Sequence, residues 1–244
     1  ASVRTRAERV AGGWALTGTK VWTSGAHLAH AFIALARTEP VDPAHRHAGL
    51  SQFIVDLRGP GVEIRPIISM NGAHHFNEVI LDGAFVPEGM VFGEIGEGWQ
   101  QVTSELAFER SGPERLSSSI VLLDELVAWL RAIGRRDPVA AAEIGAIHAR
   151  HVVLRAMSIA VTARVARGEQ PLVEAAVVKD LGTRVEQEIA DVVSRLIGAD
   201  PLAEPPAPLL GALAYVTQIG PTFSLRGGTR EILRGMIARG MGLR

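Results

Sequence analysis

The pattern of apolar and polar residues changes character near residue 95. Before that point, apolar residues alternate with polar ones or form short runs, which is typical of β-strands; these runs cover residues 2–10, 31–37, 50–56 and 75–86. Segments rich in glycine, proline and histidine separate them at 40–49 and 59–61 and predict loops. The first part of the chain is therefore predicted to form a sheet of short strands.

After residue 98 the apolar positions recur at helical spacing. Helices are predicted over residues 99–133, 138–168, 172–197, 209–218 and 228–241, with a proline-rich linker at 201–208. Gly112-Pro113 predicts a kink or break in the first helix, and Asp137-Pro138 suits the N-terminus of the second. The predicted fold is α+β: part of an antiparallel β-barrel-like domain over 1–94, then an up-and-down helical bundle over 95–244.

Composition excludes several classes of protein. Of the 244 residues, 47% are hydrophobic and 21% charged, which fits a chain that buries surface against partners, and the net charge of −1 gives no case for nucleic-acid binding. No uninterrupted apolar run approaches the roughly 20 residues of a membrane span, so none is expected. The absence of cysteine excludes disulfides and thiolate chemistry, and a reducing cytoplasm is the expected location.

Pairs of histidines are the obvious candidates for a metal site. Neither acidic residues nor further histidines complete a site around them at ligand spacing, so no metal is expected. The pairs are His45 and His47, His74 and His75, and His148 and His151.

The segment 12–25, GGWALTGTKVWTSG, has strand-forming residues on both sides of Gly18-Thr19. Because Gly-Thr is a turn signal, a β-hairpin is predicted here. A tryptophan in a strand most often packs in a core, and a serine such as Ser24 is most often a turn residue.

Three segments in order carry a resemblance to one family. The pattern Trp-x-Leu-x-Gly-x-Lys-x-Trp-x-Ser of residues 14–24 resembles the middle domain of the acyl-CoA dehydrogenases, which are FAD enzymes. Residues 79–99 resemble the family's last β-strand and its entry into the first bundle helix, and residues 226–234, RGGTREILR, its aromatic-Glu-Gly-Thr segment. The resemblance implies that the family's N-terminal helical domain and Gly-Ser-Asp flavin-phosphate motif lie outside this chain.

The resemblance implies FAD as cofactor and residues that bind it. Trp22 would pack against the flavin ring, with Thr23 beside it and the hydroxyl of Ser24 near flavin N5. Gly228 and Thr229 resemble the turn that holds the adenosine diphosphate part, and a helix N-terminus suits an anion. The remaining candidate is Glu231, which replaces a family glutamine. The family's Gln-Ile-x-Gly-Gly and Arg-Phe-Gly segments are replaced by RLIGADP and IGRRDPV.

Removal of an α-proton from a thioester requires a carboxylate beside the substrate. Gly227 stands where many members of the family carry that glutamate. The isovaleryl and long-chain types carry the base on the first bundle helix instead, at a Glu-Arg pair that Glu109-Arg110 resembles. Val102, Glu109 and Leu116 are spaced by seven, so a continuous helix would turn Glu109 inward. The alternative for Glu109 is a solvent carboxylate or a salt-bridge partner.

Three substrate-binding residues are implied beside this base. Arg110 matches an arginine that contacts the CoA portion of the substrate, and Arg226, which replaces the aromatic, is predicted to pair with Glu109 or the substrate. The backbone N–H of Gly227 can still donate to the thioester oxygen.

The predicted function is FAD-dependent dehydrogenation of an acyl-CoA to a trans-2-enoyl-CoA. The expected partners are the acyl-CoA substrate, further subunits of a homo- or hetero-tetramer formed through the bundle, and an electron-transfer acceptor protein. Two alternatives remain open: a non-catalytic subunit of a hetero-oligomeric dehydrogenase, and a relative that uses reduced flavin for hydroxylation.

Overall fold

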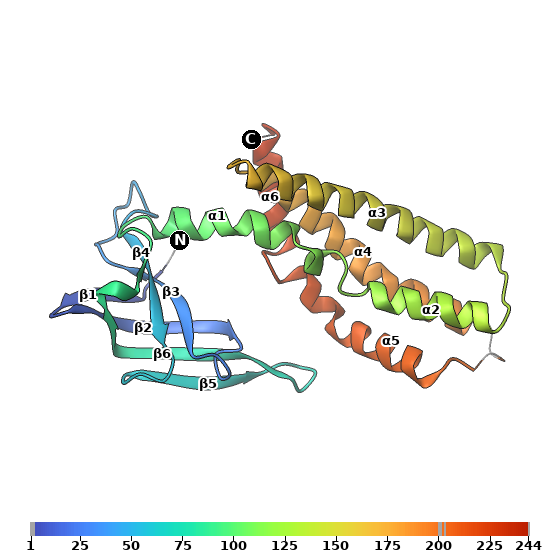
Figure 1. Cartoon of the computed structure of the whole chain (residues 1–244), viewed down its shortest axis with the longest axis horizontal. Coiled ribbons are helices and arrows are strands. Elements are labelled where there is room, and N and C mark those ends of the chain that lie inside the picture. Colours follow the sequence, from blue (N-terminus) through green and yellow to red (C-terminus); the bar gives the residue numbers. More distant parts are fainter. Residues whose placement is uncertain (1–2, 200–201, 203, 244) are drawn as a thin grey trace. The chain divides into compact units, whose positions relative to one another are not determined.

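A computed structural model describes residues 3–199, 202 and 204–243. The chain divides into two compact units, residues 1–103 and 104–244 (Figure 1). The boundary predicted from the sequence lies after residue 94. The predicted strand start at Ser2 and the first residue of the proline-rich linker, Pro201, lie outside the described residues.

The first unit is a mixed seven-stranded sheet in the order β5-β6-β2-β1-β3-β4-β7. Its strands are β1 (Arg6–Val10), β2 (Gly13–Ser24), β3 (Ala31–Arg37), β4 (Leu50–Asp56), β5 (Val62–Ile68), β6 (His74–Pro87) and β7 (Val91–Phe92). All neighbouring strands are antiparallel except β1 and β3, which are parallel. The core of this unit contains Leu16, Phe53 and Leu81, all fully buried.

The hairpin predicted at Gly18-Thr19 is wrong. β2 is one continuous strand, and the hairpin joins β1 to β2, where Val10 pairs with Gly13. Gly18 is required for a different reason: a methyl group on it would lie 2.7 Å from Cα of Thr5. The pairing of β2 with β6 also shifts in register between Leu16 and Gly18, as at a β-bulge.

The second unit is a helical bundle, and its first helix begins within the first unit. The helices are α1 (Gly98–Ser111), α2 (Ile120–Ala132), α3 (Pro138–Ala166), α4 (Leu172–Gly198), α5 (Ala207–Ile219) and α6 (Arg230–Gly240), with short 3₁₀ turns η2 (Pro113–Arg115) and η3 (Gly220–Ser224). A further 3₁₀ turn, η1 (Glu88–Met90), belongs to the first unit. The predicted helix over 99–133 is therefore two helices, because the chain breaks at Gly112-Pro113 as proline requires.

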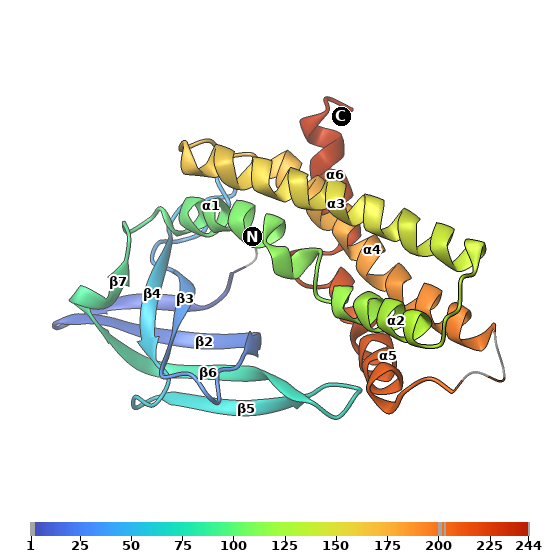
Figure 2. The same cartoon turned by 45° about the vertical axis from the view of Figure 1, so that its right-hand side comes forward.

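α4 is the central helix of the bundle (Figure 2). α2, α3, α5 and α6 all pack against it, and Leu126, Ile147, Ile189 and Leu209 are fully buried in the core. α4 also carries buried charged side chains at positions 179, 180 and 186. Because α4 buries charged as well as apolar side chains, it places polar groups inside the bundle. Such groups require hydrogen-bond or ion-pair partners there.

α3 is long and apolar enough to cross a membrane by length and composition alone. A core helix of a soluble protein passes the same test, so this criterion does not decide the predicted absence of a membrane span, which stays a prediction. α3 buries Ile147 and Leu154 against its neighbours. The hydroxyl of Ser158 also donates to the backbone oxygen of Ser111, which ties α3 to the end of α1.

Candidate active site

Glu109 lies in the last turn of α1, two residues before the helix ends at Ser111. Nη2 of Arg115 donates to its Oε1 at 2.6 Å, and Nε of Arg115 donates to its backbone oxygen at 3.2 Å. The side chain of Glu109 is 40% exposed. Leu116 lies beyond the end of the helix, so the stripe that was predicted to turn Glu109 inward does not exist.

Gly227 lies directly beside this carboxylate. Its φ of +69° is in the left-handed region that favours glycine. A methyl group at Gly227 would lie 3.5 Å from Oε1 of Glu109, 3.6 Å from Cε of Lys179 and 3.7 Å from Cγ of Arg110. The structure therefore brings the carboxylate of Glu109 to the space into which a side chain at position 227 would extend.

Arg110 is buried and fixes the Gly227 turn. Its Nε donates to the backbone oxygen of Gly227 at 2.9 Å, and Nη1 lies 3.5 Å from the sulfur of Met236. Burial lowers the pKa of Arg110, and the charge of Glu109 opposes that shift. Its predicted contact with the CoA portion of a substrate stays a prediction.

Lys179 is a residue of this cluster that was not predicted from the sequence. It is fully buried on α4, and its Nζ donates to Oγ1 of Thr183 at 2.5 Å and to the backbone oxygen of Phe223 at 2.7 Å. Burial, followed by the charge of Arg226, lowers the pKa of Lys179 to about 8. The available signal was its place on the apolar stripe of α4, between Ala176 and Thr183.

Arg226 pairs with Glu186 and not with Glu109. Its Nη2 lies 2.9 Å from Oε2 of Glu186 and donates to Oγ of Ser118 at 3.0 Å. The guanidinium also lies over the ring of Phe223, 4.6 Å from the centroid. Because the side chain of Glu186 is fully buried, Arg226 supplies the charge that compensates it.

The residues predicted to hold the adenosine diphosphate lie at the start of α6. Thr229 is the N-cap of this helix and accepts from the backbone N–H of Ile232 at 3.5 Å, and Gly228 before it has a φ of +102°. Glu231 is exposed in the first turn; a backbone hydrogen bond and one with Thr229 lower the pKa of this carboxyl. The segment is built as a capped helix N-terminus, the kind of site that suits an anion.

The residues predicted to contact the flavin ring lie in the first unit, at the end of β2. Trp22 is 63% exposed with a φ of +65°, and its ring forms a T-shaped pair with the ring of Phe76, the two centroids lying 5.6 Å apart. The backbone oxygen of Thr23 accepts from Nδ2 of Asn77 at 3.1 Å, and Ser24 is exposed. An exposed flat ring followed by two hydroxyls fits the aromatic and polar parts of a flavin.

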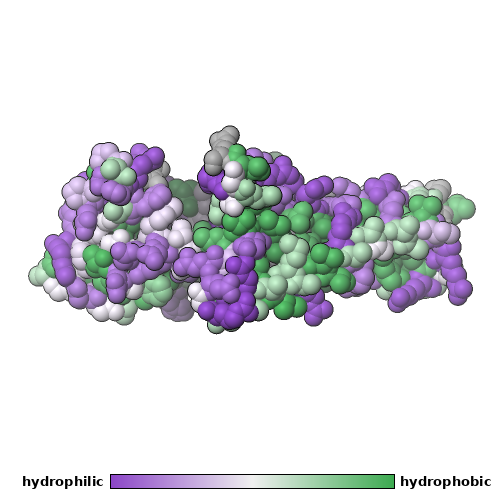
Figure 3. Space-filling model, turned by 90° about the horizontal axis from the view of Figure 1, so that it is seen from above, coloured by the Kyte–Doolittle hydropathy of each residue, from purple (hydrophilic) through white to green (hydrophobic). Residues whose placement is uncertain are grey.

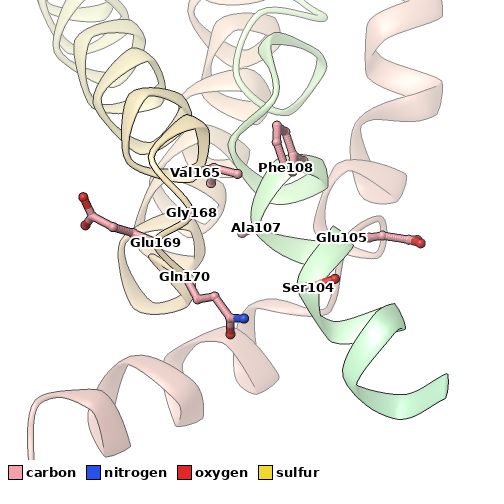
Figure 4. A pocket seen from close by; sticks show the side chains of 8 residues that line it. All are labelled: Ser104, Glu105, Ala107, Phe108, Val165, Gly168, Glu169 and Gln170. Atoms are coloured by element: carbon pink, nitrogen blue, oxygen red, sulfur yellow. The ribbon is translucent and has the colours of Figure 1, made fainter. Parts of the chain in front are cut away.

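A separate pocket of about 260 Å³ lies between α1 and the turn after α3 (Figure 4). It is lined by Ser104, Glu105, Ala107, Phe108, Val165, Gly168, Glu169 and Gln170. Glu109 is not among these residues, so the pocket is distinct from the Glu109–Gly227 cluster. Among the described residues, no group of three or more histidine, aspartate or glutamate side chains could hold a metal ion.

Comparison with known families gives two consecutive matches. The acyl-CoA dehydrogenase middle domain matches residues 1–84, and the acyl-CoA dehydrogenase C-terminal domain matches residues 96–242. The chain belongs to the acyl-CoA dehydrogenase family.

Individual relatives agree with this assignment. Acyl-CoA dehydrogenase FadE34 of Mycobacterium tuberculosis is 34% identical over 239 residues, which cover 96% of this chain and 32% of that protein. Acyl-CoA dehydrogenase IpdE1 of the same organism is 46% identical over 126 residues, 52% of this chain and 32% of IpdE1. A solved structure of a Tcur3481-Tcur3483 steroid ACAD G363A variant is 28% identical, with a TM-score of 0.87 over 100% of this chain and 65% of that one. The matched segments thus cover about a third of the length of each of these two curated relatives.

Proposed function

We propose that the protein containing this chain is an FAD-dependent acyl-CoA dehydrogenase in which Glu109 is the catalytic base. The observation that carries the proposal is the position of Oε1 of Glu109, 3.5 Å from where a methyl group at Gly227 would lie. Gly227 occupies the position at which the resemblance places the usual catalytic glutamate. A carboxylate from α1 therefore reaches the same space from another element.

The proposed reaction removes two hydrogens from neighbouring carbons of the acyl chain. Glu109 accepts the α-proton, and the electron pair of that C–H bond becomes the α,β double bond as the β-hydrogen leaves with its own pair. FAD, when bound, supplies the acceptor for that hydride. The backbone N–H of Gly227 would donate to the thioester oxygen, where negative charge develops, and Trp22, Thr23 and Ser24 would hold the flavin.

Bulky acyl groups are the substrate class that we propose. The solved relative at 28% identity is described as a steroid ACAD. In addition, glycine at position 227 leaves unfilled the space next to Glu109, which a side chain occupies in other members of the family. An electron-transfer protein would reoxidise the flavin, as the family resemblance implies.

A non-catalytic subunit is the second candidate function. The solved relatives are named as pairs, Tcur3481-Tcur3483, which favours a hetero-oligomer built from two kinds of chain. In that case the buried cluster around Lys179 would be structural, and Glu109 would have no role in turnover.

Replacement of Glu109 by glutamine separates the two candidates. In the full-length protein with its FAD and partner subunits, Glu109→Gln should leave flavin content unchanged. It should slow anaerobic bleaching of the flavin by acyl-CoA at least about 100-fold, because the amide keeps the shape and removes the base. Stopped-flow absorbance of the flavin measures this rate.

The matched control is Glu188→Gln, which removes the same charge from a surface ion pair with Arg150. It should bleach at the wild-type rate. Near-normal bleaching by Glu109→Gln would reject Glu109 as the base and favour the non-catalytic role.

A further inference from the structure

We propose that Arg115 is a positioning residue that holds the carboxylate of Glu109 against the Gly227 space; this inference rests on the proposed function of Glu109. Arg115 was not singled out from the sequence. Its effect is exerted through Glu109.

Arg115 contacts Glu109 at two points. One guanidinium nitrogen donates to the carboxylate at 2.6 Å, and another donates to the backbone oxygen of the same residue at 3.2 Å. The two contacts join the end of the side chain to its own backbone, so they restrict the rotamers that Glu109 can adopt. A half-exposed glutamate at a helix end would otherwise sample several rotamers in solvent.

The turn that carries Arg115 is itself fixed. The N–H of Arg115 donates to the backbone oxygen of Gly112 at 3.0 Å within the 3₁₀ turn η2, and the following Leu116 is buried. α4 approaches this turn so closely that a methyl group on Gly182 would lie 2.5 Å from the backbone oxygen of Arg115. Arg115 is 13% exposed, so the cation is held by the bundle while the carboxylate stays accessible.

The other charged groups near this pair come from three elements. Arg110 on α1 donates to the backbone of Gly227, and Lys179 on α4 donates to Thr183 and Phe223. Glu114 on η2 lies 3.8 Å from Nε of Arg115 and competes weakly for the same cation. Of these cations, Arg115 is the one that forms an ion pair with Glu109.

One consequence follows for proton transfer. A base must be aligned with the bond that it breaks, and a displacement of about 1 Å can cost up to about 100-fold in rate. Loss of Arg115 should therefore lower the maximal rate of flavin bleaching, while the acyl-CoA concentration that gives half of that rate changes little.

The test compares Arg115→Met and Arg115→Lys in the full-length protein with its FAD and partner subunits. Arg115→Met should reduce the plateau rate of flavin bleaching by about 10-fold to 100-fold, with little change in the acyl-CoA concentration that gives half of that rate. Arg115→Lys keeps the charge and loses the second contact, so it should rescue the plateau rate in part, to an intermediate value. Arg65→Met, which removes a bidentate pair with Glu63 on the surface of the first unit, is the control and should match wild type.

Far-UV circular dichroism and flavin content identify variants that fail to fold, and Arg115→Lys carries the test if Arg115→Met is one of them. A wild-type plateau rate in Arg115→Lys, or in a folded Arg115→Met, would overturn the inference. Glu109→Gln is measured in the same series, so that the two proposals can fail separately. Wild-type bleaching by Glu109→Gln would reject Glu109 as the base. Loss of bleaching in Glu109→Gln together with wild-type bleaching in the Arg115 variants would reject only the positioning role of Arg115.

Discussion

At the scale of single residues, the interior of the bundle is unusual for the cation it contains. Lys179 is fully buried, and its ammonium group relies on two neutral acceptors, a hydroxyl and a backbone oxygen. Neutral acceptors compensate less of the cost of burying a charge than a carboxylate does. The depressed pKa of Lys179, about 8, follows from that burial.

This pKa predicts a pH dependence of stability. The unfolded chain keeps Lys179 protonated up to its ordinary pKa of 10.5, whereas the folded chain releases the proton from about pH 8. Because the unfolded state then binds more protons, the free energy of unfolding should rise between pH 8 and 10.5, by up to roughly 3 kcal/mol. Urea unfolding of wild type and Lys179→Met, followed by circular dichroism in the far ultraviolet, measures the difference; equal pH dependence in both would contradict it.

At the scale of elements, the N-terminus of α3 shows how local chemistry sets a helix boundary. Oδ1 of Asp137 accepts from the N–H of Val139 at 2.9 Å, Pro138 follows at the first helical position, and Arg135 pairs with the same carboxylate. The hydrogen bond from Arg135, followed by the one from Val139, lowers the pKa of Asp137. The helix therefore starts where the sequence places its cap.

Removal of this cap should have a measurable cost. Asp137→Ala is expected to lower the urea midpoint of the helical unit by roughly 0.5 M, which corresponds to the typical contribution of a helix cap. Asp137→Asn keeps an acceptor at the cap and should lose clearly less. Urea unfolding midpoints of the two variants give the comparison, and an equal loss in both would assign the effect to the ion pair with Arg135.

Such local signals explain what the sequence predicts well. β3 and β4 have the predicted bounds, and the breaks at Gly112-Pro113 and Asp137-Pro138 lie where predicted, because each depends on neighbouring residues. Gly18 was wrongly predicted to form a turn. Glycine is required there because Thr5, in a separate segment, lies too close to leave room for a side chain. Arg115 and Lys179 were missed for the same reason, because their partners are set by tertiary packing. Glu109 and Trp22 were predicted through the family resemblance instead.

At the scale of the whole molecule, the helical unit presents apolar surface to solvent (Figure 3). On α3, Val152, Val153 and Ile159 are each more than half exposed. Exposed apolar patches of this kind are typical of surfaces that contact other chains or segments. The family resemblance, which implies subunit contacts through the bundle, is consistent with such a surface.

The 244-residue chain by itself should therefore associate, and it should bind FAD weakly, because the resemblance places the flavin-phosphate motif outside it. Size-exclusion chromatography with light scattering and a flavin titration test both parts. A compact monomer that does not bind an apolar dye would contradict the first, and tight stoichiometric FAD binding would contradict the second.

The positive φ of Trp22 has a consequence for how this fold can be changed. A bulky residue in the left-handed region costs on the order of 1 kcal/mol or more, which glycine would avoid. The backbone conformation that leaves the indole ring of Trp22 exposed therefore lowers the stability of the sheet. Engineering that selects for heat resistance alone would favour glycine at this position and remove the ring. Selection for thermal tolerance would therefore oppose selection for the flavin contact that we propose for Trp22.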